Sequence, residues 1–278
     1  MEEEIEENIN ENVEMVKCGG TADAVDILDG TSRSIFAIAD FHLSFPKEGG
    51  GPGTKPMNIF GGNWDNYEER IREDWNAKVG DDDIGVIAGD LSWAMKMEDA
   101  AADFAYLKSL RGTKIVIRGN HDYWWKSISR IREELGADFH VLQNDSVRIA
   151  EKGIVFAGTR GWKVPERFKP QKDDDRKIYE REVVRMDLAL KDAKSKMVTG
   201  NDGRKDKLVA IIHYPPFNAT RDDSGFTKLF EEHGVDAVIY GHLHGKPGKS
   251  DIIVTKNGIK YYHTSCDMLN HTVLKIEL

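Results

Sequence analysis

The chain has 278 residues, of which 40% are hydrophobic, and this suffices for a substantial core in one large domain or two small ones. Its formal net charge of -9 argues against a protein that binds nucleic acid along the backbone, because such proteins normally present a basic face. Two cysteines are too few for a disulfide framework, and the chain has neither an apolar start nor an apolar run of about 18 residues that would indicate secretion or a membrane span. We expect a cytoplasmic protein.

The chain is expected to form one domain over residues 34–278, preceded by an acidic extension over residues 1–33. The first 16 residues carry seven glutamates, with Ile5, Ile9, Val13 and Val16 at helical spacing. This spacing fits an amphipathic helix that docks on the domain or on a partner protein. The low apolar content fits equally a solvated acidic tail. The sequence leaves both interpretations open.

Five apolar runs end in a side chain that can bind a metal ion. They are residues 34–40, 86–90, 115–120, 208–213 and 237–242, which end in Asp40, Asp90, Asn120, His213 and His242. A buried strand places its polar residue where the hydrophobic stretch stops, and ligands of open α/β sheets gather at the carboxyl ends of strands. We therefore expect five strands that build one metal site.

Helices are expected after each of the first three of these strands. Residues 44–62 are rich in glycine and proline and predict a long loop. Apolar residues then recur at helical spacing in three segments: Tyr67, Ile71, Trp75 and Val79; Ala100, Phe104, Leu107 and Leu110; and Ile128, Ile131 and Leu135. Strands that alternate with helices indicate βαβ units in a largely parallel sheet.

The pattern changes beyond residue 140. Residues 141–149 and 153–157 predict two short strands with a tight connection, and therefore a second sheet with antiparallel pairing. Residues 163–207 contain 24 charged residues out of 45 and a narrow apolar stripe, which predicts a surface helix packed by one edge. Either this segment or residues 44–62 could close over the site as a lid.

Two pairs of candidate ligands share one spacing. Asp40 and His42 lie two residues apart, so in a strand both side chains leave the same face and can hold one cation. His242 and His244 repeat this arrangement on another strand. Each pair thus predicts half of a metal centre.

Three further side chains complete the predicted centre. Asp90 follows a glycine and has two oxygens that can bridge two ions, while Asn120 offers a carbonyl oxygen and His213 an imidazole. This mixture of donors suits two divalent ions such as Mn, Fe or Zn. With neutral imidazoles, the two ions and two carboxylates leave a charge of about +2, which favours an anionic ligand. Paired metals can clamp both oxygens of a displacement and activate a water, so phosphate ester hydrolysis is the expected reaction.

The motifs together resemble a known family. In chain order they are Asp40-Phe41-His42, Gly89-Asp90, Gly119-Asn120-His121-Asp122, the isolated His213 and Gly241-His242-Leu243-His244. Their order and spacing resemble the signature of calcineurin-like metallophosphoesterases, from Ser34 to the end of the chain. The resemblance implies an α/β fold, a four-layer α/β/β/α sandwich of two mixed sheets flanked by helices. It also implies one metal on Asp40, His42 and His244, a second on Asn120, His213 and His242, and Asp90 as the bridge.

The resemblance also implies catalytic roles. His121 would be the general acid and phosphate-binding histidine, and Asp122 would orient it. The expected enzyme hydrolyses a small phosphomonoester or phosphodiester with a hydroxide activated by two metals, while His121 protonates the leaving alkoxide. Arg118, Arg160 and Asn218 are candidate substrate contacts.

Each motif alone also has a structural explanation. Asp-x-His commonly caps a turn, and Gly-Asn tolerates left-handed conformations. Aromatic residues near the motifs, Trp93, residues 123–125 and Trp162, could stack on a base or simply cover the rims of the sheet. The alternative function is a non-catalytic interaction module on the same sandwich, with the acidic extension as its docking arm. Such a module does not require the complete ligand set, so the five motifs together favour the enzyme.

Overall fold

Two β-sheets form the centre of the protein. The computed structural model describes residues 34–46, 55–201, 203–248 and 250–278, so the predicted extension over residues 1–33 and its partner lie outside the described residues. The first sheet has the order β11-β1-β2-β3-β4 and the second β5-β6-β7-β8-β10-β9. The strands of the first sheet are β1 (Ile35–Ile38), β2 (Ile84–Ile87), β3 (Thr113–Ile117), β4 (Phe139–Leu142) and β11 (Leu274–Ile276). Those of the second are β5 (Asp145–Ile149), β6 (Ile154–Thr159), β7 (Lys207–Ile212), β8 (Ala237–Tyr240), β9 (Ile253–Lys256) and β10 (Ile259–His263).

Both sheets are mixed, with parallel strands at the centre. β1, β2, β3 and β4 pair in parallel, as do β6, β7, β8 and β10. Antiparallel strands lie at the edges: β11 beside β1, β5 beside β6, and β9 beside β10. Because the carboxyl ends of parallel strands lie at one edge of a sheet, the loops that follow them are neighbours.

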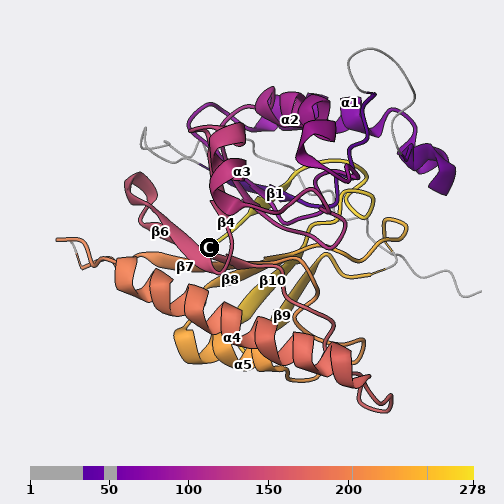
Figure 1. The fold of residues 1–278 in the computed structure, drawn as a ribbon. Coiled ribbons are helices and arrows are strands. Elements are labelled where there is room, and N and C mark those ends of the chain that lie inside the picture. Colours follow the sequence, from indigo (N-terminus) through magenta and orange to yellow (C-terminus); the bar gives the residue numbers. More distant parts are fainter. Residues whose placement is uncertain (1–33, 47–54, 202, 249) are drawn as a thin grey trace, which may run out of the picture. The chain divides into compact units, whose positions relative to one another are not determined.

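Helices cover the outer face of each sheet (Figure 1). α1 (Tyr67–Lys78), α2 (Ala101–Lys108) and α3 (Ile128–Leu135) flank the first sheet, and all three were predicted from helical spacing. α4 (Asp173–Lys196) and α5 (Gly225–His233) flank the second. The predicted four-layer α/β/β/α sandwich is therefore confirmed. Within the described residues, every helix is too short or too polar to cross a lipid bilayer.

Alternating residues of each strand explain the layers. In β1, Phe36 and Ile38 belong to the core under α1, α2 and α3, whereas Ile35 and Ala37 belong to the core between the two sheets. Successive side chains of a strand point to opposite faces, so one short apolar strand contributes to both cores. This arrangement is why the strands appear in the sequence as continuous apolar runs.

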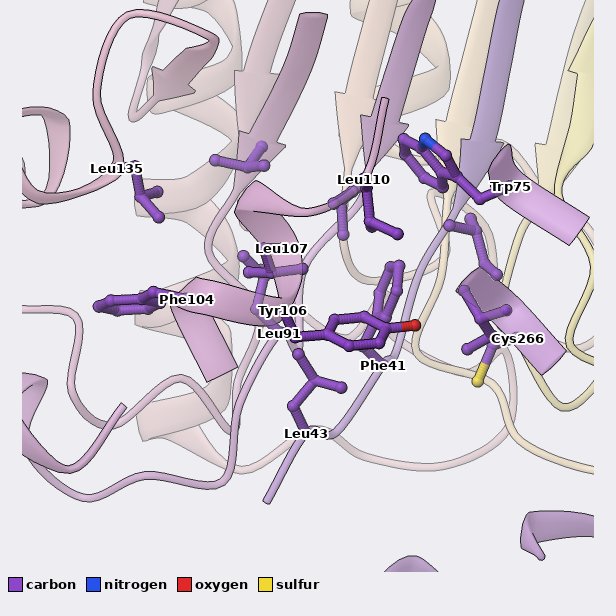
Figure 2. Packing of buried hydrophobic residues seen from close by; sticks show 14 of the residues in the cluster. Phe41, Leu43, Trp75, Leu91, Phe104, Tyr106, Leu107, Leu110, Leu135 and Cys266 are labelled. Atoms are coloured by element: carbon purple, nitrogen blue, oxygen red, sulfur yellow. The ribbon is translucent and has the colours of Figure 1, made fainter. Parts of the chain in front are cut away.

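The loops that leave the strands of the first sheet are anchored in the helical core. Figure 2 shows Phe41, Leu43 and Leu91 among the buried side chains of α1 and α2, and all three have no exposed surface. Phe41 and Leu43 alternate with the predicted ligands Asp40 and His42. Burial of the apolar partners thus fixes the backbone on which the polar side chains are mounted.

Two segments differ from their predictions. Residues 141–149 form no single strand, because β4 ends at Leu142 in the first sheet and β5 starts at Asp145 in the second. Asn144 takes a left-handed φ of 63° at this crossing, where a short polar side chain is tolerated. Residues 44–62 are not wholly irregular, since the 3-10 helices η1 (Met57–Phe60) and η2 (Gly62–Trp64) occupy the last part. Two further such turns are η3 (Met97–Asp99) and η4 (Ala150–Lys152).

α4 is the surface helix predicted within residues 163–207. Its buried apolar side chains, Met186, Ala189, Leu190 and Ala193, pack on the second sheet. The rest of the helix is mostly charged, and its first turn holds three aspartates. Glu182 is an exception, because its carboxylate is buried with 1% of its surface exposed.

Candidate active site

Seven predicted ligands converge where the strands of both sheets end. We call Asp40, His42, Asp90, Asn120, His213, His242 and His244 the histidine–carboxylate cluster. They follow β1, β2, β3, β7 and β8, which are far apart in the chain but end at the facing edges of the two sheets. The sandwich therefore brings together the residues that the sequence analysis singled out.

The backbone reaches this arrangement through left-handed turns. Asp40, His42, Asp90 and His242 have φ angles of 61°, 49°, 53° and 74°. Residues other than glycine seldom adopt this region, and such strain collects at functional sites. The expected strand geometry for Asp40 and His42 is thus replaced by a tight turn that still directs both side chains into the cluster.

One part of the cluster contains Asp40, His42 and His244. The Nε2 atoms of the two histidines are 3.1 Å apart. Asp40 Oδ1 lies 3.9 Å from His42 Nε2 and 3.7 Å from His244 Nε2. Two imidazole nitrogens that bind one ion at about 2.0–2.1 Å are themselves about 3 Å apart, so this spacing suits a shared cation.

The other part contains Asn120, His213 and His242 beside Asp90. His213 Nε2 lies 2.9 Å from Asn120 Oδ1 and 3.4 Å from Asp90 Oδ2. The rings of His213 and His242 have their centroids 5.1 Å apart. Ligand atoms of Asp90, His213 and His242 all lie within 4.8 Å of one another, as do those of the first part.

Asp90 lies between the two parts. Its Oδ2 atom is 3.7 Å from His42 Nε2 and 3.4 Å from His213 Nε2. Its other oxygen, Oδ1, accepts a hydrogen bond of 2.7 Å from the backbone of His121. Asp90 Oδ2 therefore lies in reach of a histidine from each part, the position that a bridging ligand requires.

The chemistry of these atoms fits a bound cation. Asp40 Oδ1 and Asp90 Oδ2 are buried and have no hydrogen-bond partner within the described part of the chain. Buried carboxylate oxygens are costly unless they are paired with a hydrogen or a positive charge. The imidazole nitrogens of the same cluster lie 3.4 to 3.9 Å from these two oxygens, and a divalent ion would pair with both kinds of atom.

Three of the ligands have their remaining polar atom held by the surrounding protein. Asp40 Oδ2 accepts hydrogen bonds of 2.8 Å from His242 N and from the Ser265 hydroxyl. His213 Nδ1 lies 2.9 Å from the carbonyl of Ala88, and His244 Nδ1 lies 3.2 Å from Asp267 Oδ1. Such outer partners fix the orientation and tautomer of a metal-binding side chain. They leave Asp40 Oδ1 and both Nε2 atoms to face the cluster.

Ser265 and Asp267 were missed by the sequence analysis. They follow β10, which pairs in parallel with β8 and therefore ends at the same edge. The apolar run over residues 259–262 ends, like the five others, in polar residues, but those lie several positions further on. The run was thus a usable signal for a sixth strand end at the site.

The electric field of the cluster favours positive charge. Burial opposes a charge on His213, but the nearby Asp90 and Asp40 carboxylates outweigh it and raise the pKa of this imidazole to about 9. Burial and the charge of His213 lower the pKa of His242 to about 3. The carboxylates therefore draw one positive charge into the cluster, and a divalent cation would answer the same demand more fully.

Asp122 braces the loops that carry the ligands. Its buried carboxylate accepts hydrogen bonds from the backbone of Asp90, Leu91, Ser92 and Gly119 and from the indole of Trp124, at 2.7 to 3.2 Å. Gly119 makes this packing feasible, because a Cβ there would lie 2.0 Å from Asp90 Oδ1. The loops after β2 and β3 are thereby tied together through one carboxylate.

His121 lies beside the cluster with its ring half-buried. Its centroid is 4.3 Å from that of Trp93, which stacks on His42 at 4.7 Å with an interplanar angle of 20°. Its Nδ1 lies 3.4 Å from the Tyr123 hydroxyl. Burial lowers the pKa of His121, and the positive charge of Lys55 acts in the same direction against the effect of Asp90. Trp124 and Trp125 are core residues, as the packing interpretation predicted.

The three candidate substrate contacts lie in two cavities beside the cluster. Arg118 and Arg160 line a cavity of about 290 Å³. Asn218 lines a larger cavity of about 640 Å³, which also includes His242 and Tyr214. The Asn218 amide donates to the Pro165 carbonyl and to Asp222, both at 3.1 Å, so it holds the wall of this cavity together.

Comparison with known proteins agrees with this geometry. The model of the calcineurin-like phosphoesterase family matches residues 33–246. The chain belongs to this family. No curated protein matches this chain.

Solved structures resemble this phosphoesterase at low sequence identity. The phosphopantetheinyl hydrolase of Mycobacterium tuberculosis is 13% identical over 89% of this chain and 96% of its own, with a TM-score of 0.51. A protein of unknown function from Aquifex aeolicus is 16% identical over 88% and 96%, with a TM-score of 0.44. The protein TT1561 of Thermus thermophilus is 12% identical over 88% and 98%, with a TM-score of 0.47. The hydrolase supports the sandwich fold and nothing further.

Proposed function

We propose that the protein is a metal-dependent hydrolase of small phosphomonoesters or phosphodiesters. The observation that carries this proposal is the histidine–carboxylate cluster, in which the buried, unpaired oxygens Asp40 Oδ1 and Asp90 Oδ2 face imidazole nitrogens. The family membership of the chain agrees with the reaction class.

Each ligand has a proposed place. Asp40, His42 and His244 would hold one divalent ion, and Asn120, His213 and His242 the other, with Asp90 shared between them. Divalent ions held by these residues would supply Lewis acidity toward a phosphoryl oxygen and toward an attacking water. Mn, Fe and Zn all suit the mixture of imidazole, carboxylate and amide donors.

His121 is the proposed general acid. Its imidazole lies at the edge of the cluster, with its backbone N–H bound to Asp90 Oδ1 and its ring against Trp93. A lowered pKa makes the protonated ring a stronger acid toward a leaving alkoxide, while it reduces the protonated fraction at neutral pH. Asp122 would orient His121 through the backbone, since its carboxylate holds the loop on which His121 is mounted.

The cavity beside His242 is the proposed site for the leaving group. Its volume of about 640 Å³ lies in the range of small-molecule pockets. Tyr214, Phe217 and Val254 supply apolar walls. The charged part of the lining is mixed: Lys163, Lys169, Lys172 and Arg221 beside Glu166, Asp175 and Asp251. A small phosphorylated molecule with an apolar part suits this cavity better than a protein chain or a nucleic acid strand.

Turnover of chromogenic phosphomonoesters and phosphodiesters by the full chain tests the proposal. The protein loaded with Mn should hydrolyse at least one of the two types, lose that activity with a chelator, and regain it when Mn is restored. Absence of chelator-sensitive turnover with Mn, Fe and Zn on both substrate types would contradict the proposal. A panel of phosphorylated metabolites on the active form then narrows the leaving group.

A further inference from the structure

A second cavity opens beside the cluster, where the carboxyl ends of β3, β4 and β6 meet α4. We call it the arginine cavity and define it by Arg118, Lys126, Arg160, Arg181, Glu182 and Arg185. Its volume is about 290 Å³. Arg181 and Arg185 have side chains that are 52% and 40% exposed, so the cavity reaches solvent.

The cavity is strongly positive in a protein of net charge -9. Five cationic side chains line it against the single carboxylate of Glu182, which leaves a net charge of +4. Like charges gathered in a concave wall repel one another, and the field that they create is focused into the cavity. This concentration of positive charge is unfavourable for the folded state, and a bound anion would relieve the repulsion.

Glu182 satisfies only a small part of this demand. Its Oε1 atom is shared by three guanidinium groups, at 2.7 Å from Arg185, 3.4 Å from Arg181 and 3.8 Å from Arg160. Its Oε2 accepts a hydrogen bond of 3.3 Å from Thr159. Each guanidinium carries five N–H groups, so Glu182 can accept from only a few of the donors around the cavity.

The two arginines that follow β3 and β6 carry a further indication. The Nε atom of Arg118 is buried and has no hydrogen-bond partner in the regions of the chain that the structure describes. Burial lowers the pKa of Arg160, Glu182 raises it, and the neighbouring charge of Arg118 lowers it again. A buried donor and a pair of like charges thus face the same small volume.

We propose that the arginine cavity binds the phosphoryl group, or a similar compact oxyanion, as a site separate from the histidine–carboxylate cluster. Guanidinium groups bind the oxygens of a phosphate through paired, charge-assisted hydrogen bonds, which is what Arg118, Arg160 and Arg185 offer together. A volume of about 290 Å³ is ample for one such group. The ligand is either the second phosphoryl group of a substrate or a free anion.

The two sites are connected through the backbone. The carbonyl of Arg160 accepts hydrogen bonds of 3.1 Å from the backbone N–H groups of His213 and Tyr214. Arg118 lies two residues before Asn120. An anion held by these two arginines therefore lies next to the loops that carry candidate ligands.

Calorimetric titration of inorganic phosphate into the metal-free full chain tests the proposal, and it requires no turnover. In this form no metal ion can hold phosphate at the cluster, and the arginine variants assign the binding to the arginine cavity. We expect one phosphate per chain. Arg181→Gln and Arg185→Gln should each weaken binding about tenfold, as expected for a lost charge-assisted hydrogen bond. Arg185→Lys should fall between them and the unmodified protein.

Arg176→Gln is the matched control, because Arg176 is an exposed arginine of the same helix with Asp173 and Glu180 as partners. It should leave phosphate affinity unchanged. Absence of phosphate binding to the metal-free chain, or equal weakening by Arg176→Gln and Arg185→Gln, would overturn the proposal. If the chain unfolds without metal, the titration is repeated on the Mn-loaded chain. That chain should bind two phosphates, and its Arg181→Gln/Arg185→Gln variant only one. Two phosphates bound by both proteins would overturn the proposal.

A sugar bisphosphate and the matching monophosphate distinguish the two sources of the anion. If the second phosphoryl group of a substrate occupies the cavity, Arg185→Gln raises the KM of the bisphosphate about tenfold and leaves that of the monophosphate unchanged. If both KM values stay unchanged while phosphate binding is lost, the ligand is a free anion. Failure of the proposed hydrolysis removes this comparison but leaves the calorimetric result intact.

Discussion

The histidine–carboxylate cluster and the arginine cavity lie at the same ends of the strands and collect opposite kinds of side chain. In the cluster, two buried carboxylates face imidazole nitrogens, and His42 Nε2 and His244 Nε2 lie 3.1 Å apart. In the cavity, three arginines share one carboxylate oxygen of Glu182. The edge of a parallel sheet thus supplies the position of a site, whereas the polarity of the side chains decides whether a cation or an anion fits there.

The two regions also differ in how firmly they are held. Asp40 and His213 are fully buried, and each has one polar atom bound by the surrounding protein. Arg181 and Arg185 are half exposed and belong to a surface helix. The cluster is therefore suited to a resident ion of fixed geometry, and the cavity to an anion that exchanges with solvent.

Asp90→Asn should have the largest effect, because it removes the charge between the two parts of the cluster. We expect fewer than two metal ions per chain and a loss of turnover of about a thousandfold or more, since bound metals contribute several kcal/mol to such reactions. Metal analysis and kinetics on the purified variant check this. Asp83→Asn, at the opposite end of β2, is the matched control and should keep both ions. Two ions retained by Asp90→Asn would contradict the bridging role.

His121→Ala should separate acid catalysis from metal binding. Turnover should fall about a hundredfold or more while the metal content stays unchanged, because the imidazole is proposed to supply a proton and no ligand. The loss should be smaller for a substrate whose leaving group needs no protonation, such as a nitrophenolate. His140→Ala, in β4, is the control. An equal loss for good and poor leaving groups would count against the acid role.

Asp267→Asn tests whether the outer partners set the geometry of the cluster. Asp267 Oδ1 lies 3.2 Å from His244 Nδ1, and loss of its charge should weaken metal affinity about tenfold. Competition with a fluorescent chelator measures the change. Asp187→Asn removes a similar contact, 3.1 Å from His233 Nε2 between α4 and α5, and should leave metal affinity unchanged. Equal effects of the two variants would remove Asp267 from the site.

His271 lies outside the cluster and offers a test of stability at acid pH. Of the four substitutions, the one at His271 should affect catalysis least. Burial and the charge of Arg70 lower its pKa to about 4 from an ordinary 6.5. The unfolded chain therefore protonates this imidazole at a higher pH than the folded chain does. As the pH falls from 6.5 to 4, His271 thus lowers the free energy of unfolding by up to about 3 kcal/mol. The free energy of unfolding, measured with urea at both pH values, should change less with pH for His271→Asn than for the unmodified protein. Asparagine tolerates the left-handed φ of 59° at this position. An unchanged difference would refute the assignment.

Much of the fold was predictable because local patterns agree with the tertiary structure. The spacing of Tyr67, Ile71 and Trp75 marks α1 because one face of the helix must be apolar. The division of residues 141–149 between two sheets was not predictable, since β4 and β5 are both short and the crossing at Asn144 depends on contacts with distant strands. Similarly, no local pattern connects Asp267 with His244.

The sequence by itself predicted the residues that gather at the strand ends, because apolar runs that stop at polar side chains are a local property. The four layers followed only from the resemblance of its motifs to a known family. Tertiary structure alone decided that Asp40, His42 and Asp90 reach the cluster through left-handed turns, and that four arginines from two strand ends and one helix line one cavity. These features depend on contacts between segments far apart in the chain. Such contacts form only when both sheets have packed, so they leave no periodic trace in the order of the residues.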